Sequence, residues 1–264
     1  MPYTPTPQPT PSDNGIVIRA FGYSDQGRFR STNEDCFAID HDLGLLVVAD
    51  GMGGHSAGDV AARITVDTIV DAVSDRCGTT PAVPSDADVL RSAIQRAGER
   101  IRDAVLVDRN RAGMGTTIVA ARVDGDRLSV ASAGDSRVYV LSDGNLRQLT
   151  KDDSWLAGVL AEDGDADRFA LQHHPLRHAV TNAVGAAAKT IVHVVETTVV
   201  PGDRLLLTTD GVHDVMDEWR LEQLLLEDDD PRTIAENVVR SALNRGSQDN
   251  CTAVVAAITV CYST

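Results

Sequence analysis

The chain has 264 residues, and its 24 Lys and Arg side chains against 39 Asp and Glu side chains give a formal net charge of −15. This excess of negative charge repels phosphate backbones and anionic lipid headgroups, so it argues against general nucleic-acid binding and against binding to a membrane surface. Aromatic residues make up only 4% of the chain, and we therefore expect a core of Ala, Val, Leu and Ile, large enough for one domain.

The N-terminal residues 1–14 alternate Pro with Thr, Gln and Ser, a composition that predicts a disordered tail because it cannot pack a core. The tail has no signal-peptide pattern, and no apolar run in the chain is long enough to cross a membrane. The cysteines are widely spaced and form no C-x-x-C pair: Cys36, Cys77, Cys251 and Cys261. This spacing favours neither a zinc site nor a disulfide framework, so we expect a cytoplasmic protein.

Regular structure is predicted to begin after the tail. Strands are expected at 16–23, 36–40 and 43–50, and the last is the continuous apolar run of a buried strand. A helix is expected at 57–76, and a second helix begins at Ser85, with Asp88 three residues on as its capping partner. The apolar stripes of both helices predict that they pack on a sheet.

Further strands follow in a row at 116–123, 127–134, 137–142 and 146–150, and the Asp-Gly turns among them predict an antiparallel meander. Residues 151–185 mix short helical pieces with an acidic loop and are expected to form an excursion from the sheet. The remaining pattern predicts strands at 191–200, 204–209 and 251–260, with helices at 219–227 and 231–245 between the last two. Strands interrupted by pairs of helices favour an antiparallel sheet sandwich with helices outside.

Acidic residues stand at the ends of several predicted strands. Asp50 and Asp210 each precede a glycine after an apolar strand, Asp135 follows a third strand, and Asp249 comes just before the last one. Each of them alone is ordinary turn chemistry. Because sheets bring strand ends together, these carboxylates would repel one another unless cations lay between them. Ligation by oxygen alone favours Mg²⁺ or Mn²⁺.

Residues 24–35 add an arginine shortly before the adjacent carboxylates Glu34 and Asp35. The planar guanidinium of Arg30 can hold a phosphate through two parallel hydrogen bonds, as a hydrolase of phosphate esters needs. An exposed charged loop is the alternative interpretation of this segment alone.

The order of these motifs resembles the metal-dependent Ser/Thr protein phosphatases of the PPM family, the type 2C phosphatases, and most closely their bacterial members. The matching segments extend from the first predicted strand to the last: SDQGRFRSTNED (24–35), VVADGMGGHSAGDVAA (47–62), GMGTT (113–117), AGDSRVYVL (133–141), LTKDDSW (149–155), HPLRHAVTNAVG (174–185), PGDRLLLTTDGVHDVM (201–216) and SQDNCTAVV (247–255). One Asp-Gly pair is weak support, whereas eight segments in the family's order are strong support.

The resemblance implies an α+β fold for residues 15–264: a four-layer α-β-β-α sandwich with two mainly antiparallel sheets, helices outside and a flap at about 151–185. It also implies a centre of two Mn²⁺ or Mg²⁺ ions at one edge of the sheets, with a third ion common in bacterial members. By motif position, Asp50 would bridge two metals and the Gly51 carbonyl would bind one of them. The other metal positions fall on Asp35, Asp135, Asp210 and Asp249, and on Glu34 through water. Arg30 matches the arginine that binds the substrate phosphate.

The implied activity is hydrolysis of phosphoserine and phosphothreonine on proteins by attack of a metal-activated water, with Asp50 and Arg30 as catalytic residues. The expected partners are phosphoproteins and a bacterial Ser/Thr kinase whose action the enzyme, a monomer, reverses. A pseudophosphatase that binds phosphoproteins without turnover is the alternative from another class, but the metal aspartates it would lack are present. A phosphatase of anti-sigma-factor antagonists shares the chemistry and serves another pathway.

Two positions depart from the family pattern. Met52 stands where many eukaryotic members have a histidine that protonates the leaving group, which leaves His55 or a metal-bound water as the candidate acid. Asp153 stands where relatives often have His, which leaves the substrate contacts of that segment open. A zinc site on His173, His174 and His178 is a further alternative, but no additional spaced ligand supports it.

The two cysteines beside motif acids, Cys36 and Cys251, are interpreted as packing residues, because no neighbouring base would activate a thiol nucleophile. For the rest of the acidic surface, the net charge predicts a preference for phosphopeptides with basic flanks.

Overall fold

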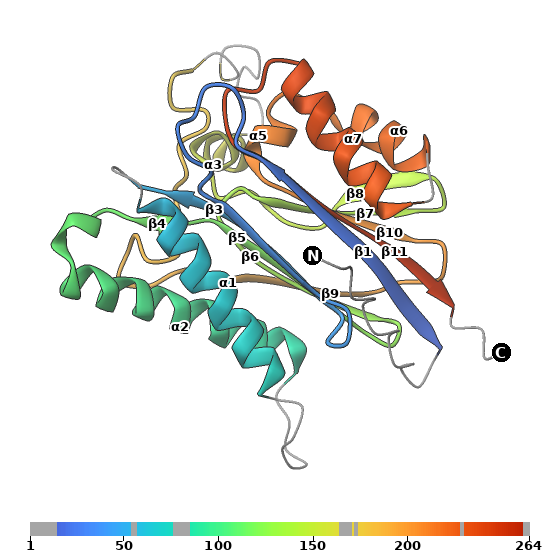
Figure 1. Ribbon diagram of the computed structural model, residues 1–264, viewed down its shortest axis with the longest axis horizontal. Helices are drawn as coiled ribbons and strands as arrows, with labels where there is room; N and C mark the ends of the chain where they lie inside the picture. The colour runs from blue at the N-terminus through green and yellow to red at the C-terminus, as the bar shows by residue number, and fades with distance from the viewer. Residues whose placement is uncertain are drawn as a thin grey trace, which may run out of the picture.

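The computed structural model describes residues 15–53, 57–75, 85–163, 171, 174–227 and 230–260. Two antiparallel sheets face each other, and helices cover the outer face of each sheet (Figure 1). The predicted α-β-β-α sandwich is therefore confirmed. The predicted tail, residues 1–14, lies outside the described residues.

The chain passes between the two sheets several times, so each sheet combines strands from distant parts of the sequence. One sheet has the order β1 (Ile16–Asp25), β11 (Cys251–Val260), β10 (Arg204–Thr208), β7 (Arg137–Ser142) and β8 (Asn145–Gln148). The other has the order β2 (Asp35–Asp40), β3 (Leu45–Met52), β5 (Ile118–Asp124), β6 (Arg127–Ala133) and β9 (His193–Thr198), and the short β4 (Gly115–Thr116) pairs with the end of β3.

Each sheet has its own helical layer. The β3 sheet is covered by α1 (Gly58–Ser74) and α2 (Asp86–Val107), and the β10 sheet by α5 (Asp210–His213), α6 (Glu218–Glu227) and α7 (Pro231–Asn244). The predicted start of α2 is confirmed, because the Ser85 hydroxyl accepts a hydrogen bond from the Asp88 N–H at 3.1 Å. A single 3₁₀ turn, Arg109–Arg111, follows α2.

The position of strand β3 explains why its sequence is continuously apolar and does not alternate with polar residues. Leu45, Val47 and Ala49 pack against α1 and α2, whereas Leu46 and Val48 face the other sheet. Successive side chains of a strand point to opposite faces, so a strand in an inner layer must be apolar on both. This arrangement places the polar end of β3, from Asp50 onward, at the rim of the sandwich.

The predicted meander is wrong. Strands β5 and β6 form a hairpin in one sheet, β7 and β8 form a hairpin in the other, and β7 pairs with β10 instead of β6. The two real hairpins have two-residue turns, which the Asp-Gly pairs mark. Between β6 and β7 the chain instead crosses from sheet to sheet at Gly134, where φ is +103° and a Cβ atom would lie 2.6 Å from Cβ of Thr117. Only glycine fits this crossing.

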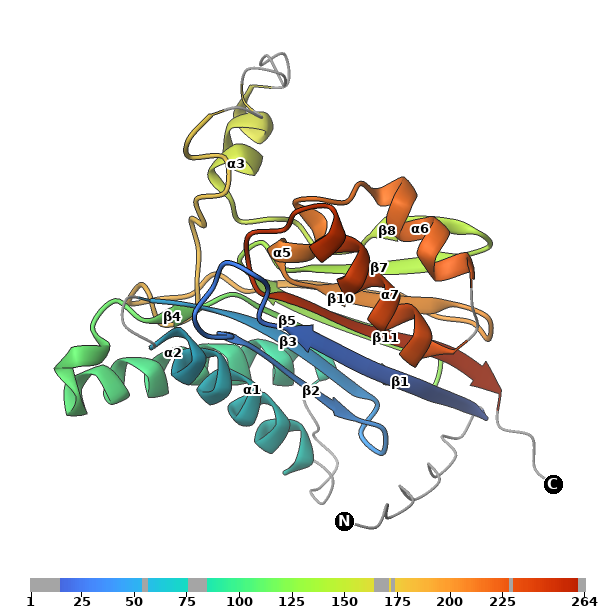
Figure 2. The same ribbon diagram turned by 45° about the horizontal axis from the view of Figure 1, so that its top comes forward.

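The excursion after β8 leaves the sandwich and returns before β9. It includes α3 (Trp155–Glu162), which stands away from both sheets in Figure 2 and has no fully buried side chain. The described parts of 151–185 therefore agree with the predicted flap.

Candidate active site

Asp35 and Asp50 lie next to each other at one end of the β3 sheet. The register of β2 and β3 pairs Asp35 directly with Asp50. Like charges in directly opposite positions destabilise an antiparallel pair of strands. The pairing of Asp35 with Asp50 therefore does not serve the stability of the sheet, and it points to a functional role for the two carboxylates.

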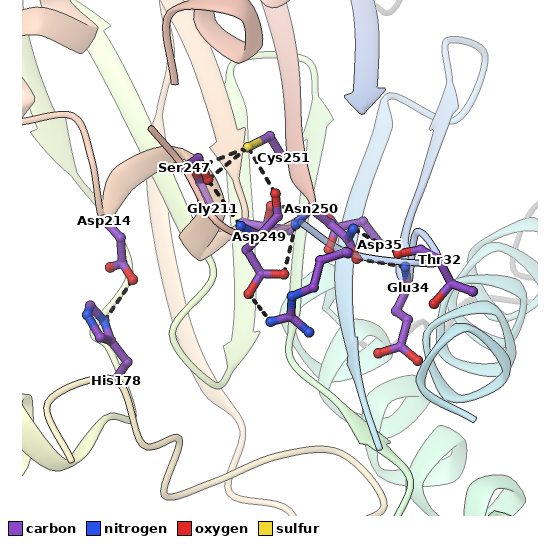
Figure 3. A network of polar contacts seen from close by, with 12 residues as sticks. Thr32, Glu34, Asp35, His178, Gly211, Asp214, Ser247, Asp249, Asn250 and Cys251 are labelled. Atoms are coloured by element: carbon purple, nitrogen blue, oxygen red, sulfur yellow. Dashed lines mark hydrogen bonds and ion pairs between the residues drawn. The ribbon is translucent and has the colours of Figure 1, made fainter. Parts of the chain in front are cut away.

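The other sheet contributes Asp210 and Asp249. Asp210 begins α5 after β10, Asp249 precedes β11, and these two strands are neighbours. Asp35 connects the sheets, because its Oδ2 accepts hydrogen bonds from Oγ1 of Thr209 at 3.0 Å and from Oγ1 of Thr252 at 2.6 Å. The structure therefore brings together the four carboxylates at the predicted edge. Figure 3 shows two of them, Asp35 and Asp249.

The electrostatics of the cluster reflect this crowding. Burial, together with the charges of Asp210 and Asp249, raises the pKa of Asp35 to about 7, although the two threonine hydroxyls act in the opposite direction. Burial and the charge of Asp35 raise the pKa of Asp50 well above its ordinary value. Burial and Asp249 also raise the pKa of Asp210. Protons or cations are needed to hold these groups together.

The donor set fits divalent cations. Oδ1 of Asp35 and Oδ1 of Asp210 are buried without a hydrogen-bond partner, and hard cations prefer such carboxylate oxygens. Within the described ranges, no three acidic, histidine or cysteine side chains are yet close enough together to hold a metal ion. Joint ligation of one ion by these carboxylates would require their side chains to turn toward it.

Gly51 allows the start of α1 to approach β3 closely. A Cβ atom at Gly51 would lie 2.2 Å from the carbonyl oxygen of Gly58, and the Gly51 N–H donates to the Glu34 carbonyl at 3.2 Å. The Glu34 carboxylate accepts the backbone N–H of Gly58, which opposes the effect of burial in raising its pKa. Glu34 thus lies at the N-terminus of α1, where the helix dipole favours an anion.

Arg30 lies in the same cavity as the acidic cluster. It forms an ion pair with Asp249, and the cavity, of about 550 Å³, is lined by Arg30, Arg177, His178, Asp210, Asp214 and Asp249 among others. An arginine on the wall of an open cavity can bind an anionic ligand. Carboxylates on the same wall can bind cations that also contact that ligand.

Asp135 lies at the crossing between the sheets and is only 6% exposed. Burial and the nearby charges of Asp210, Asp152 and Asp214 raise its pKa to about 8. The structure therefore places Asp135 within the field of Asp210, as a shared cation site between them requires.

The histidines of the flap do not form a zinc site in the described part of the chain. The His174 ring stacks on Trp155 with centroids 4.1 Å apart, and Nδ1 of His178 lies 2.7 Å from Oδ2 of Asp214 (Figure 3). His173, the other member of the zinc hypothesis, lies outside the described residues, as does His55, the candidate acid.

The thiols near the cluster are in environments that oppose reactivity. Burial raises the pKa of Cys251 to about 11 and also raises the pKa of Cys36, which packs against the first helical layer. A buried thiol with a raised pKa is a poor nucleophile. The environment of both residues agrees with their interpretation as packing residues.

Several polar residues of the site were not identified from the sequence. Asn250 joins segments far apart in the chain: its Oδ1 accepts the Glu34 N–H at 2.9 Å, and its Nδ2 donates to the carbonyls of Gln26 and Thr32. Thr209 and Thr252 donate to Asp35. A threonine at a strand end is common for reasons of strand propensity alone, so the sequence offered no separate signal.

The chain thus has the features of a protein that binds cations and an anionic ligand together: a sandwich of two sheets, a buried carboxylate cluster at one edge of the sheets, and an arginine beside it. Residues 28–228 match the family model described as Protein phosphatase 2C. The chain belongs to this family, as its ordered motifs indicated.

Individual relatives agree with this assignment. The chain is 35% identical to the serine/threonine protein phosphatase PstP of Mycobacterium tuberculosis over 247 residues, which cover 91% of this chain and 45% of PstP. It is 34% identical to the serine/threonine phosphatase stp of Listeria monocytogenes, covering 88% of this chain and 92% of that protein. The chain thus spans less than half the length of PstP but nearly all of stp.

Solved structures show the same fold. A crystal structure of M. tuberculosis PstP aligns with a TM-score of 0.83 at 31% identity, over 92% of this chain and 99% of that one. The catalytic domain of PstP in complex with two manganese ions aligns with a TM-score of 0.81 at 30% identity, over the same shares of the two chains. In the described ranges of this chain, none of the helices has both the length and the apolar character needed to cross a bilayer.

Proposed function

We propose that this chain is a metal-dependent protein phosphatase that hydrolyses phosphoserine and phosphothreonine on proteins. One observation carries the proposal: carboxylates of two sheets, Asp35, Asp50, Asp210 and Asp249, meet in one cluster. Two of them, Asp210 and Asp249, line a cavity together with Arg30. The names of the two relatives described above, both serine/threonine phosphatases, and the two manganese ions bound by the PstP catalytic domain support the same activity.

In this proposal the acidic residues bind cations and the arginine binds the substrate phosphate. Asp50, Asp210 and Asp249, with Asp35, the Gly51 carbonyl and Glu34 through water, would hold two cations, and Asp135 with Asp210 would hold a third. Mn²⁺ or Mg²⁺ bound there would lower the pKa of a water molecule and offset the charge that develops on the phosphoryl oxygens. Arg30 would bind and orient the substrate phosphate, and this requires that it exchange its ion pair with Asp249 for the phosphate.

The cytoplasmic location, the monomeric state, the domain limits of 15–264 and a Ser/Thr kinase as the opposing enzyme remain predictions from the sequence. The substrates in the cell are likewise proposed only as a class, phosphoproteins.

The direct test measures hydrolysis of p-nitrophenyl phosphate and of a phosphothreonine peptide with Mn²⁺ and with a chelator. We expect turnover only with Mn²⁺, and we expect Asp210→Asn to lower kcat by about 100-fold or more, because it removes a metal ligand. Asp42→Asn, an exposed aspartate in the turn between β2 and β3, is the matched control and should leave turnover unchanged. Binding of the phosphopeptide without turnover would instead identify a pseudophosphatase.

A further inference from the structure

Asp153 lies where the flap leaves the sandwich, and it binds the segment at which the chain crosses between the sheets. Its N–H donates to the Gly134 carbonyl at 2.9 Å, and its Oδ2 accepts the Gly134 N–H at 3.1 Å. Both backbone groups of Gly134 are therefore held by one residue. The next residue along the chain is Asp135.

The same residue also holds the returning end of the flap. Asn182 donates from Nδ2 to Oδ2 of Asp153 at 2.6 Å, and Thr181 donates to the Asp153 carbonyl from its N–H at 2.8 Å and from its hydroxyl at 2.9 Å. The two ends of the flap thus meet on the residue that fixes Gly134.

His193 of β9 fixes the carboxylate itself. Its Nε2 lies 2.8 Å from Oδ1 of Asp153, whose side chain is 14% exposed. Oδ1 is therefore directed by the imidazole, and Oδ2 by Gly134 and Asn182. With partners on both oxygens, the carboxylate has one orientation in which all of these hydrogen bonds form.

The crossing segment is held on its far side by Thr117, which also binds the backbone of Asp50. Thr117 Oγ1 lies 2.7 Å from Ser136 Oγ and accepts the Asp50 N–H at 3.2 Å, and the Thr117 N–H donates to the Asp50 carbonyl at 2.9 Å. Asp135 therefore lies between two anchors. Thr117 anchors it to Asp50, and Asp153 anchors it to the flap.

We propose that Asp153, oriented by His193, is a positioning residue that sets the backbone of Gly134 so that Asp135 can bind a divalent cation beside Asp210. The inference rests on the proposed function, because it assigns a role to Asp135 in the cation centre. It also gives Asp153, which departs from the family pattern, a defined task outside direct contact with the substrate.

The test measures Mn²⁺ binding by the electron paramagnetic resonance signal of free Mn²⁺, which needs no turnover. Asp153→Asn removes the carboxylate charge that strengthens the hydrogen bonds from Gly134 and Asn182. Its Nδ2 also faces a donor unless His193 changes to the tautomer in which Nε2 accepts. We expect the most weakly bound Mn²⁺ to lose about 10- to 100-fold in affinity, as it does in Asp135→Asn, while the tighter ions are retained. The double variant should bind no more weakly than Asp135→Asn alone, because both changes act on one site.

Variants of the partner test the orientation. His193→Gln retains a side-chain N–H donor and should restore much of the Mn²⁺ affinity that His193→Ala loses, and this pair also serves if Asp153→Asn does not fold. Asp86→Asn is the matched control, because it removes a buried carboxylate paired with Arg122 between α2 and β5. It should lower the melting temperature without a change in Mn²⁺ binding.

Three results would overturn the inference: wild-type Mn²⁺ binding in Asp153→Asn, losses that add in the double variant, or unchanged binding in Asp135→Asn. Failure of the proposed function is a separate result, namely a wild-type protein that binds Mn²⁺ and hydrolyses no phosphopeptide. In that case the comparison of the variants still decides the role of Asp153.

Discussion

At the scale of single residues, Arg30 has two competing partners. Without a substrate its guanidinium pairs with Asp249, a predicted metal ligand, and both side chains are partly exposed. An exposed ion pair contributes at most about 1 kcal/mol, so a divalent cation or a phosphate can readily replace either partner. The pair keeps the arginine at the cavity and partly offsets one carboxylate of the cluster.

Replacing Arg30 should therefore have opposite effects on the two ligands. Arg30→Ala removes charge-assisted hydrogen bonds to the phosphate, so we expect kcat/KM for a phosphothreonine peptide to fall by about 10- to 100-fold. It also frees Asp249, so Mn²⁺ should bind equally well or up to about five-fold more tightly, as calorimetry can measure. Arg28→Ala, an exposed neighbour outside the cavity lining, is the control. Weaker Mn²⁺ binding in Arg30→Ala would contradict the competition.

At the scale of elements, α2 and α3 begin with the same kind of cap but differ in what they bury. Ser85 accepts the Asp88 N–H at the start of α2, and Ser154 accepts the Ala157 N–H at 3.2 Å at the start of α3. Helix α2 packs fully buried side chains such as Leu90 against the sheet, whereas α3 has none. Loss of the cap of α2 should therefore lower the stability of the whole fold, whereas loss of the cap of α3 should lower only the local stability of that helix.

Alanine at each cap tests this difference. We expect Ser85→Ala to lower the free energy of global unfolding by about 1 kcal/mol. Ser154→Ala should leave global unfolding unchanged and instead accelerate amide hydrogen exchange in α3 by about five-fold, the equivalent of about 1 kcal/mol of local stability. Denaturant unfolding with hydrogen exchange measures both quantities. A fall in global stability in Ser154→Ala would show that the flap unfolds together with the sandwich.

The sequence predicted the elements better than their assembly. The apolar runs of β3 and β11 and the Ser85 cap of α2 are local signals, and the structure confirms those elements. The local signals did not predict that the chain crosses from one sheet to the other at Gly134. Strands β6 and β7 are both apolar on both faces, so each of them could be buried in either sheet. Asn250 was missed for a similar reason: its partners lie more than 200 residues away in the chain.

At the scale of the whole molecule, the net charge of −15 acts on every approaching substrate. Bound divalent cations would neutralise much of the acidic cluster, so the remaining field comes from the outer surface. Such a field raises the rate of encounter with cationic partners, and salt screens it over about 10 Å at 0.1 M. The charge therefore favours phosphopeptides with basic flanks at low salt.

Peptide pairs test this expectation without any change to the protein. At low ionic strength we expect kcat/KM to be several-fold higher for a phosphothreonine peptide with Lys and Arg flanks than for one with Asp and Glu flanks. The ratio should shrink toward one as NaCl is added, because screening removes the long-range attraction. Equal turnover of the two peptides at low salt would refute the preference.

The cluster also makes the stability of the metal-free protein depend on pH. The pKa of Asp35 and of Asp214 is raised to about 7 and that of Asp135 to about 8, from ordinary values near 3.8, in each case chiefly by burial. At neutral pH the unfolded chain has already lost these protons and the folded protein still holds part of them. These groups therefore contribute their full stabilisation of the folded state below about pH 4. The contribution falls as the pH rises from there, and it is lost once the pH has passed the folded-state pKa values of about 7 to 8. His213 acts in the opposite direction only below its ordinary pKa of 6.5, because burial lowers its pKa well below that value.

The window from pH 6.5 to 8.5 thus isolates the carboxylates. In a chelator, we expect the melting temperature to fall across this window by roughly 5 °C or more, as a loss of a few kcal/mol gives in a chain of this size. Asp214→Asn, which removes a raised carboxyl outside the predicted metal ligands, should make the fall shallower. In the proposed cation centre, Mg²⁺ would replace protons on Asp35 and Asp135, so the increase in melting temperature that it causes should be larger at pH 8.5 than at pH 6.5. A melting temperature that stays constant or rises in the chelator would show that the carboxylates do not hold protons in the folded state, and that their repulsion is relieved in another way.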